Sequence, residues 1–342
     1  MPLIKIGLAA PFEGLQRPLG YEALAGVKMA LAERNAAGGV AGYRVELVAL
    51  NDFGEPEEAR LQAREFAVDP AVIGVVTGWT DETARASLPV YQQAGLAVVV
   101  AWSVSPELAE RGSGVVLVAA DTQRAAGELA EVVAIAHPRQ VLVVADESSS
   151  ALYQEALVAR GLEARVLSLA GALDDRFFQE QPPDALLLAT DGATAGEVLA
   201  TQKWEVIAFG GAEAGSVHVT SVGGQAADGF IFVSPAPAGR DAMQAESAVA
   251  SDLEGLGPRA VLAYDATHVL LDAIELAVRE NGHPDRAGVA SALSRVRRDG
   301  LTGAIAFDAD GRRLNVPVWL YKIVDANYPG QRVVLPSLVG DE

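Results

Sequence analysis

The 342-residue chain contains no cysteine. This absence excludes disulfide bonds, thiol nucleophiles and thiolate metal sites, and it is compatible with an oxidising compartment. Positive charge is also scarce, because 26 Lys and Arg stand against 45 Asp and Glu, for a net charge of −19. Nucleic-acid binding depends on Lys and Arg that neutralise phosphates, and no basic run here is longer than a pair. We therefore expect no nucleic-acid partner.

The sequence patterns of enzymes and membrane proteins are missing as well. No G-x-S-x-G elbow, no Walker A sequence and no G-x-G-x-x-G opening a first helix is present. The four histidines, His137, His218, His268 and His283, do not have metal-ligand spacing. No apolar run reaches the roughly 18 to 20 residues that a membrane-spanning helix needs. The sequence thus predicts a protein that is not an enzyme and has no cofactor or metal.

Short apolar runs recur along the chain and are separated by segments with helical periodicity. Continuous apolar strands that alternate with helices are typical of parallel sheets covered on both faces, so we predict an α/β fold. The length suits two domains. We place one α/β unit up to about Val118 and a second from about Asp121 to Val233. The expected strands are Ile4–Ala9, Val45–Leu50, Val72–Val76, Ala97–Ala101, Val141–Ala145, Leu186–Ala189 and Val206–Phe209.

Two helices carry local signals. Leu24, Val27 and Leu31 form one apolar stripe, and Gly38 is placed to end that helix. The pair Ser105–Pro106 predicts a second helix, because serine caps free N–H groups and proline is tolerated at the first helical position.

A glycine-bounded apolar strand runs into Phe307-Asp308-Ala-Asp310-Gly311, which predicts a tight turn. Further motifs stand in fixed order along the chain: Ile4 to Gly14, Gly26 to Asn35 with Gly38-Gly39, Asn51 to Ala59, Ser105 to Leu108, and Tyr264 to Ala266. In this order they resemble the branched-chain amino-acid-binding protein family, the type I periplasmic solute-binding proteins of ABC importers. The resemblance covers nearly the whole chain.

This resemblance implies the type I periplasmic binding protein fold, with two doubly wound parallel-sheet lobes joined by a three-segment hinge. The implied lobes are residues 1–119 plus 237–316 and residues 120–236 plus 317–342, with the ligand cleft between them. It implies an extracytoplasmic receptor that captures a small amino-acid-like or amide- or amine-bearing solute by lobe closure. The alternative is a sensor of the same fold that reports occupancy to a regulatory partner.

The implied partners are a small-molecule solute and the permease subunits of the transporter, and we expect a monomer. The implied location is the periplasm or the cell surface. Since no signal region precedes the first strand, we expect that the export signal has been removed from this chain.

The ligand crevice of a doubly wound sheet lies beyond the carboxyl ends of its strands. The candidate residues of the first lobe are therefore Trp79, Thr80 and Asp81 after one strand, and Trp102, Ser103 and Val104 after the next. By resemblance, Asp81, Trp102 and Val104 replace small or hydroxyl-bearing positions of the amino-acid clamp, so we expect a solute other than a simple branched-chain amino acid. Asp81 is interpreted as a helix N-cap beside the ligand. Trp79 and Trp102 are either ligand walls or core residues.

The candidates of the second lobe are Ser150, Asp191 and Glu213. By resemblance, Ser150 and Asp191 replace tyrosines that close over the ligand. Glu213 falls near the glutamate that binds the ligand's ammonium group, and its other interpretation is an ordinary surface charge. Two indoles beside several carboxylates would suit a cationic or amide-bearing ligand.

Overall fold

A computed structural model describes the chain except for residues 103, 146, 173–182, 202–205, 243–253 and 335–342. The described chain divides into two compact units. Unit 1 comprises Met1–Thr122 and Pro235–Pro317, and unit 2 comprises Gln123–Ser234 and Val318–Glu342. Each unit is built around its own sheet.

Unit 1 contains a five-stranded parallel sheet in the order β2-β1-β3-β4-β5. Its central strands are apolar on both sides because helices cover both faces, which is why they form continuous hydrophobic runs. The strand bounds are Leu3–Ala10 for β1, Arg44–Asn51 for β2, Val72–Thr77 for β3, Ala97–Val100 for β4 and Val115–Leu117 for β5.

The helices of unit 1 pack in two layers. One core cluster lies between the sheet and α1, α12 and α13, and another lies between the sheet and α2 and α3. The bounds are Arg17–Ala36 for α1, Pro56–Val68 for α2, Asp81–Gln93 for α3, Gly239–Ala242 for α10, Pro258–Asn281 for α12 and Arg286–Leu293 for α13. In the predicted α1 stripe, Val27 and Leu31 are buried and Leu24 is partly buried.

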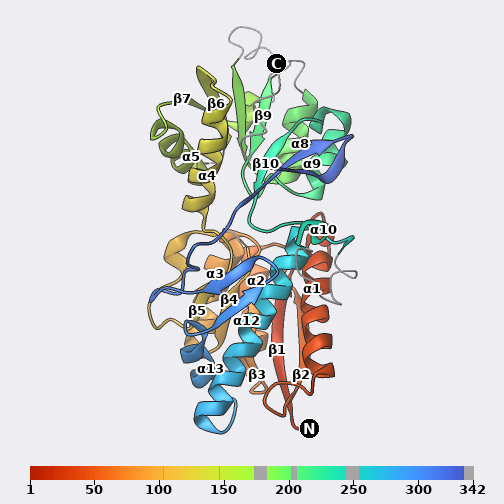
Figure 1. The fold of residues 1–342 in the computed structure, drawn as a ribbon, viewed down its shortest axis with the longest axis vertical. Helices are drawn as coiled ribbons and strands as arrows, with labels where there is room; N and C mark the ends of the chain where they lie inside the picture. The colour runs from red at the N-terminus through yellow and green to blue at the C-terminus, as the bar shows by residue number, and fades with distance from the viewer. Residues whose placement is uncertain (103, 146, 173–182, 202–205, 243–253, 335–342) are drawn as a thin grey trace. The chain divides into compact units, whose positions relative to one another are not determined.

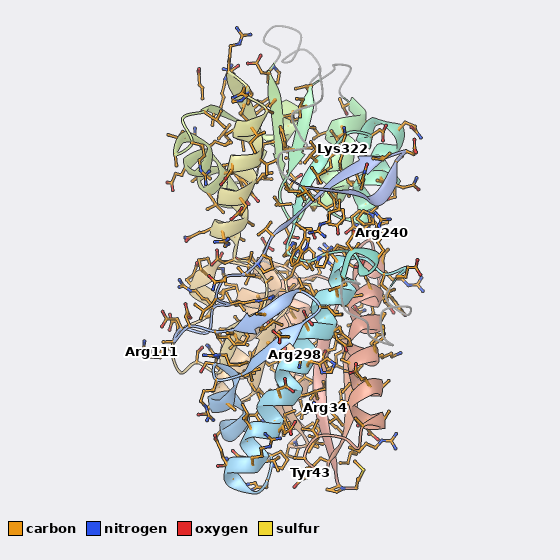
Figure 2. The ribbon with its side chains drawn as sticks, viewed as in Figure 1. Arg34, Tyr43, Arg111, Arg240, Arg298 and Lys322 are labelled. Atoms are coloured by element: carbon orange, nitrogen blue, oxygen red, sulfur yellow. The ribbon has the colours of Figure 1, made fainter. Side chains whose placement is uncertain are left out.

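Helices α1 and α12 run side by side on this face of the sheet (Figure 1). They approach closely where Gly26 of α1 meets the backbone of α12, since a Cβ added at Gly26 would lie 2.0 Å from Ala260 O. An ion-pair cluster joins the same two helices further along. Arg34 of α1 and Arg298 both contact Asp272 of α12, and Figure 2 shows both arginines along that helix.

The predicted C-terminal turn is confirmed. Strands β11 (Arg297–Gly300) and β12 (Gly303–Ala306) form an antiparallel pair, and the chain turns after Phe307. Asp308 Oδ1 accepts hydrogen bonds from the N–H groups of Asp310 and Arg312, at 2.9 Å each. Gly311 adopts a φ of 90°, which favours glycine.

Unit 2 contains a seven-stranded sheet in the order β14-β13-β10-β9-β8-β6-β7. The pairs from β7 to β10 are parallel, and β13 and β14 add antiparallel at the edge. The strands are Gln140–Ala145 (β6), Glu163–Leu167 (β7), Ala185–Ala189 (β8), Ile207–Gly210 (β9), Ile231–Ser234 (β10), Trp319–Val324 (β13) and Asn327–Val333 (β14). The helices include Thr122–Ile135 (α4), Glu147–Val158 (α5), Leu169–Ala172 (α6), Gly192–Thr201 (α8) and Val217–Gly223 (α9). The α/β fold class with parallel-dominated sheets is thus as predicted.

The helix predicted at Ser105–Pro106 is wrong in extent. Only a single 3₁₀ turn, η1 (Pro106–Leu108), forms, and Ser105 makes no side-chain cap. The chain becomes extended at Ala109 and then passes through Gly112 and Gly114, both of which have positive φ, so no α-helix can propagate.

Candidate functional site

The strand order of unit 1 reverses between β1 and β3, so the topological switch point lies at the carboxyl ends of these two strands. In open α/β sheets ligands bind outside this edge. The loops that leave it follow Ala10 of β1, Thr77 of β3 and Val100 of β4. These are the loops in which the sequence placed Trp79 and Trp102.

Trp79 joins the two strands at the switch point. Its Nε1 donates a hydrogen bond of 2.9 Å to Ala9 O of β1, and only 4% of the residue is exposed. The preceding Gly78 has a φ of 76°, which turns the chain sharply out of β3. Trp79 thus belongs to the core cluster between the sheet and α1, α12 and α13. Its role as a ligand wall stays a prediction.

The helix cap after β3 is one residue earlier than expected. Thr80 is the N-cap of α3, and its Oγ1 accepts a hydrogen bond of 3.2 Å from Thr83 N. The interpretation of Asp81 as the N-cap is therefore wrong. Asp81 is the first helical residue, and its carboxylate binds both Arg85, at 2.8 Å, and the backbone N–H of Ser105, at 2.7 Å.

Asp81 therefore fixes the loop after β4 to the start of α3. Both of its oxygens are engaged by donors from the chain itself. Because Arg85 compensates the charge of Asp81, this carboxylate would repel an anionic ligand less than an unpaired carboxylate would.

The loop after β4 carries a buried Trp102. It is 1% exposed and packs in the same core cluster as Trp79. Val104 is also buried, but in the cluster on the other face of the sheet. Trp102 and Val104 therefore leave the loop toward different layers, while Ser103 lies outside the described residues.

An arginine that the sequence analysis did not select covers the Trp102 ring. The guanidinium carbon of Arg259 lies 3.9 Å from the ring centroid, and Arg259 is only 2% exposed. The indoles were expected to attract a cationic ligand. At Trp102 the cation on the ring face is instead Arg259, which lies in the first turn of α12. The sequence signal for this helix start is Gly257-Pro258, since proline favours the first helical position.

Glu22 of α1 stabilises the same helix start. Its Oε1 accepts hydrogen bonds from the N–H groups of Arg259, at 2.7 Å, and Ala260, at 3.3 Å. Burial raises the pKa of Glu22, while the nearby Arg259 charge and these two N–H groups act in the opposite direction. Glu22, Arg259 and Trp102 therefore form one continuous group at this edge.

The candidates of unit 2 lie on three different elements. Asp191 caps α8, because its Oδ1 accepts from Ala193 N at 2.9 Å and from Thr194 N at 3.1 Å. Ser150 lies within α5, and Glu213 lies partly buried in the turn between β9 and α9. Asp191 thus has a clear structural role. The ligand-binding roles of all three stay predictions.

A comparison with known protein families identifies the family of this chain. A family model described as periplasmic binding protein matches residues 3–174 and 176–328. The chain belongs to the periplasmic binding protein family. This confirms the resemblance described above, and it makes the protein a solute-binding protein and not an enzyme.

Relatives of this periplasmic binding protein point the same way. An amino acid binding protein of Pseudomonas aeruginosa is 30% identical over 32% of the chain, and this match spans 29% of that relative. A leucine-, isoleucine-, valine-, threonine- and alanine-binding protein of the same organism is 23% identical, with 93% of this chain and 89% of the relative covered. A solved leucine-binding protein from Thermotoga maritima aligns with a TM-score of 0.82 and 21% identity, over 95% of this chain and 96% of that one. This confirms the fold.

The described part of the periplasmic binding protein offers two further observations. No described helix combines the length and apolar character needed to cross a bilayer. Among the same residues, no group of three or more His, Asp or Glu side chains is arranged to hold a metal ion.

Proposed function

We propose that this periplasmic binding protein is the extracytoplasmic receptor of an ABC importer and captures a small amino-acid-like solute. The observation that carries the proposal is the family match, which extends from residue 3 to residue 328. The relatives named for amino acids motivate the solute class. The proposed partners are the permease subunits of the transporter, and the proposed location is the periplasm or the cell surface.

The proposed site is the carboxyl edge of the unit 1 sheet, where Trp79 and Trp102 belong to one core cluster and Arg259 covers the Trp102 ring. Buried aromatic rings and a few placed polar groups are the usual lining of a small-molecule site. The proposed mechanism is closure of two lobes about the solute, in which the bound solute stabilises the closed state.

We also propose that simple branched-chain amino acids are not the solute. Trp102 is 1% exposed and Arg259 covers its ring face. By the resemblance, Trp102 takes a position that is small in the amino-acid clamp, so we expect less room for a branched aliphatic side chain. Calorimetry with leucine, isoleucine and valine tests this point. Sub-micromolar binding of any of the three would contradict it.

A thermal-shift screen over amino acids, amides, amines and organic acids tests the proposed function as a whole. A solute at 100 times its Kd should add about 2.7 kcal/mol to the free energy of unfolding. Small-angle scattering with and without the solute found in this way tests closure, since a closed form has the smaller radius of gyration. If no solute of these four classes shifts the melting temperature, the receptor proposal fails.

A further inference from the structure

Large apolar side chains are exposed on two neighbouring loops at the carboxyl edge of the unit 1 sheet. Leu15, in the loop after β1, is 66% exposed, and Phe53, in the loop after β2, is 43% exposed. Tyr21 of α1 is 48% exposed and packs edge-on against the ring of Phe12, with 5.8 Å between the ring centroids. Single exposed apolar residues are ordinary, whereas a group of them on linked loops marks an interaction surface. We call Leu15, Tyr21 and Phe53 the loop-tip patch.

The two loops are held together by the chain itself. Asn51 Oδ1 accepts hydrogen bonds from the N–H groups of Phe12, at 2.8 Å, and of Phe53, at 3.0 Å. A Cβ added at Gly54 would lie 2.7 Å from Gln16 Oε1, so the two loops also touch at their tips. The loop-tip patch is therefore one preorganised surface, which lowers the entropic cost of binding a partner.

The backbone of Phe53 is in an uncommon conformation. Its φ of 54° lies in the left-handed region, which glycine and asparagine adopt far more readily than a bulky side chain does. Asp52 stabilises this turn, because its Oδ1 accepts from Gly54 N at 2.9 Å and its backbone O accepts from Glu55 N at 2.8 Å. Strain of this kind is concentrated at functional sites. An exposed aromatic ring held at a local cost thus favours a use of the ring outside the fold.

The charges around the loop-tip patch select the kind of partner. Glu13 and Glu55 are exposed in the two loops. The neighbouring cations are engaged, since Arg60 pairs with Glu57 and the guanidinium carbon of Arg17 lies 5.1 Å from the centroid of a ring of the patch. The whole chain carries a net charge of −19. A second copy of the chain or an anionic lipid surface would meet like charge here, whereas a protein face with Lys and Arg around an apolar hollow would be attracted.

This surface is distinct from the proposed solute site. Strand β2 is the edge strand in the order β2-β1-β3-β4-β5, so β1 separates the strand before Phe53 from β3 and β4. The loops after β3 and β4 carry Trp79 and Trp102. Docking and solute binding can therefore be measured independently.

We propose that the loop-tip patch docks on the permease subunits of the importer, at a face that offers an apolar hollow with Lys or Arg side chains around it. This inference rests on the proposed receptor function and names the surface through which the receptor reaches its partner. Leu15 and Phe53 fill the hollow, and Glu13 and Glu55 pair with the cations at its rim. Buried anchors near the centre of an interface dominate its affinity, and complementary rim charges mainly speed and orient the encounter.

Site-specific photo-crosslinking in the cells that express the receptor identifies what the patch touches. The photoreactive residue p-benzoylphenylalanine replaces Phe53 in one strain and Val68 in another. Val68 is the matched control, because it is 74% exposed on unit 1 but ends α2, a 13-residue helix, about 18 Å from the start of that helix. We expect position 53 to crosslink to a permease subunit, identified by mass spectrometry at a peptide that contains Lys or Arg, and position 68 to give no such product.

Substitutions measure what the patch contributes. Phe53→Asn removes the ring and suits the left-handed backbone better, so the melting temperature should not fall. Uptake of the solute found in the thermal-shift screen should fall on the order of tenfold, with an unchanged calorimetric Kd for that solute, because an interface anchor is lost. Leu15→Ser should act in the same way, and Glu13→Lys together with Glu55→Lys should also lower uptake by reversing the rim charge. The control Val68→Asn should leave uptake unchanged.

The possible outcomes separate this inference from the receptor function. A crosslink from position 53 only to a second copy of the receptor or to lipid overturns the inference, and so does an equal permease crosslink from position 68. Wild-type uptake by Phe53→Asn overturns it as well; if that variant does not fold, Leu15→Ser decides by the same measurement. If deletion of the receptor gene abolishes uptake while position 53 gives no permease crosslink, the docking surface is refuted and the receptor function stands. If no solute binds in the wider screen, the receptor function itself fails.

Discussion

Replacing Gly26 by alanine tests the close approach of α1 and α12, on which the position of Arg259 depends. A Cβ on Gly26 would lie 2.0 Å from Ala260 O, whereas ordinary contact begins near 3.4 Å, so backbone must move by the difference, 1.4 Å. The obstacle is main chain and not the end of a flexible side chain. Overpacking of this kind costs about 1–3 kcal/mol or more, against a gain of about 1 kcal/mol from replacing glycine within a helix.

We therefore expect Gly26→Ala to lower the free energy of unfolding by about 2 kcal/mol. This is the upper overpacking cost of about 3 kcal/mol less the helix-propensity gain of about 1 kcal/mol. Because Arg259 immediately precedes Ala260, the displaced α12 should also weaken solute binding. Urea unfolding monitored by circular dichroism measures the first effect, and calorimetry measures the second.

Gly127 provides the matched control. It lies inside α4, as Gly26 lies inside α1, and a Cβ built there meets no atom within 4 Å. Gly127→Ala should therefore raise the stability of the protein by about 0.5–1 kcal/mol through helix propensity alone. The reasoning fails if both variants change stability in the same direction, because the same chemical change would then act without regard to the space around it.

Three further variants test single interactions of unit 1. Thr80→Ala should cost about 1 kcal/mol by removing the cap of α3, and Thr80→Ser should restore most of it in the same unfolding assay. Arg286 donates to the carbonyl oxygens of Val72, Ala67, Ala94, Phe66 and Asp69, so Arg286→Lys should still cost about 2–3 kcal/mol of unfolding free energy, because one ammonium cannot replace a planar fork. Burial raises the pKa of Asp52 from 3.8 to about 6, so the folded state binds this proton more tightly than the unfolded state does. The free energy of unfolding should therefore fall by about 2 kcal/mol through this group as the pH rises from 4 to 6.5. That fraction of the pH dependence should be absent in Asp52→Asn, and an identical pH profile in the two proteins would contradict the assignment.

The parts of the fold that were predictable from sequence are those governed by local patterns. Strands β1, β3 and β4 are buried on both faces, so they form continuous apolar runs. Strand β7 escaped prediction because Glu163–Leu167 lies at the sheet edge, where most of its residues face solvent and no apolar run is required. At Thr80 and Asp81 two adjacent residues are both good caps, and only the backbone geometry selects the threonine.

The pairing of Trp102 with Arg259 was beyond local reasoning, since the two residues are far apart in sequence and meet only when α12 packs on the sheet. The sequence nevertheless contained a sign of it. Gly257-Pro258 marks a helix start, and a cation in the first turn of a helix opposes the helix dipole. Local preferences that conflict with the fold are expected chiefly at functional sites, where another interaction offsets the cost. Arg259 is such a conflict, and the interactions that offset it include the carboxylate of Glu22 and the indole face of Trp102.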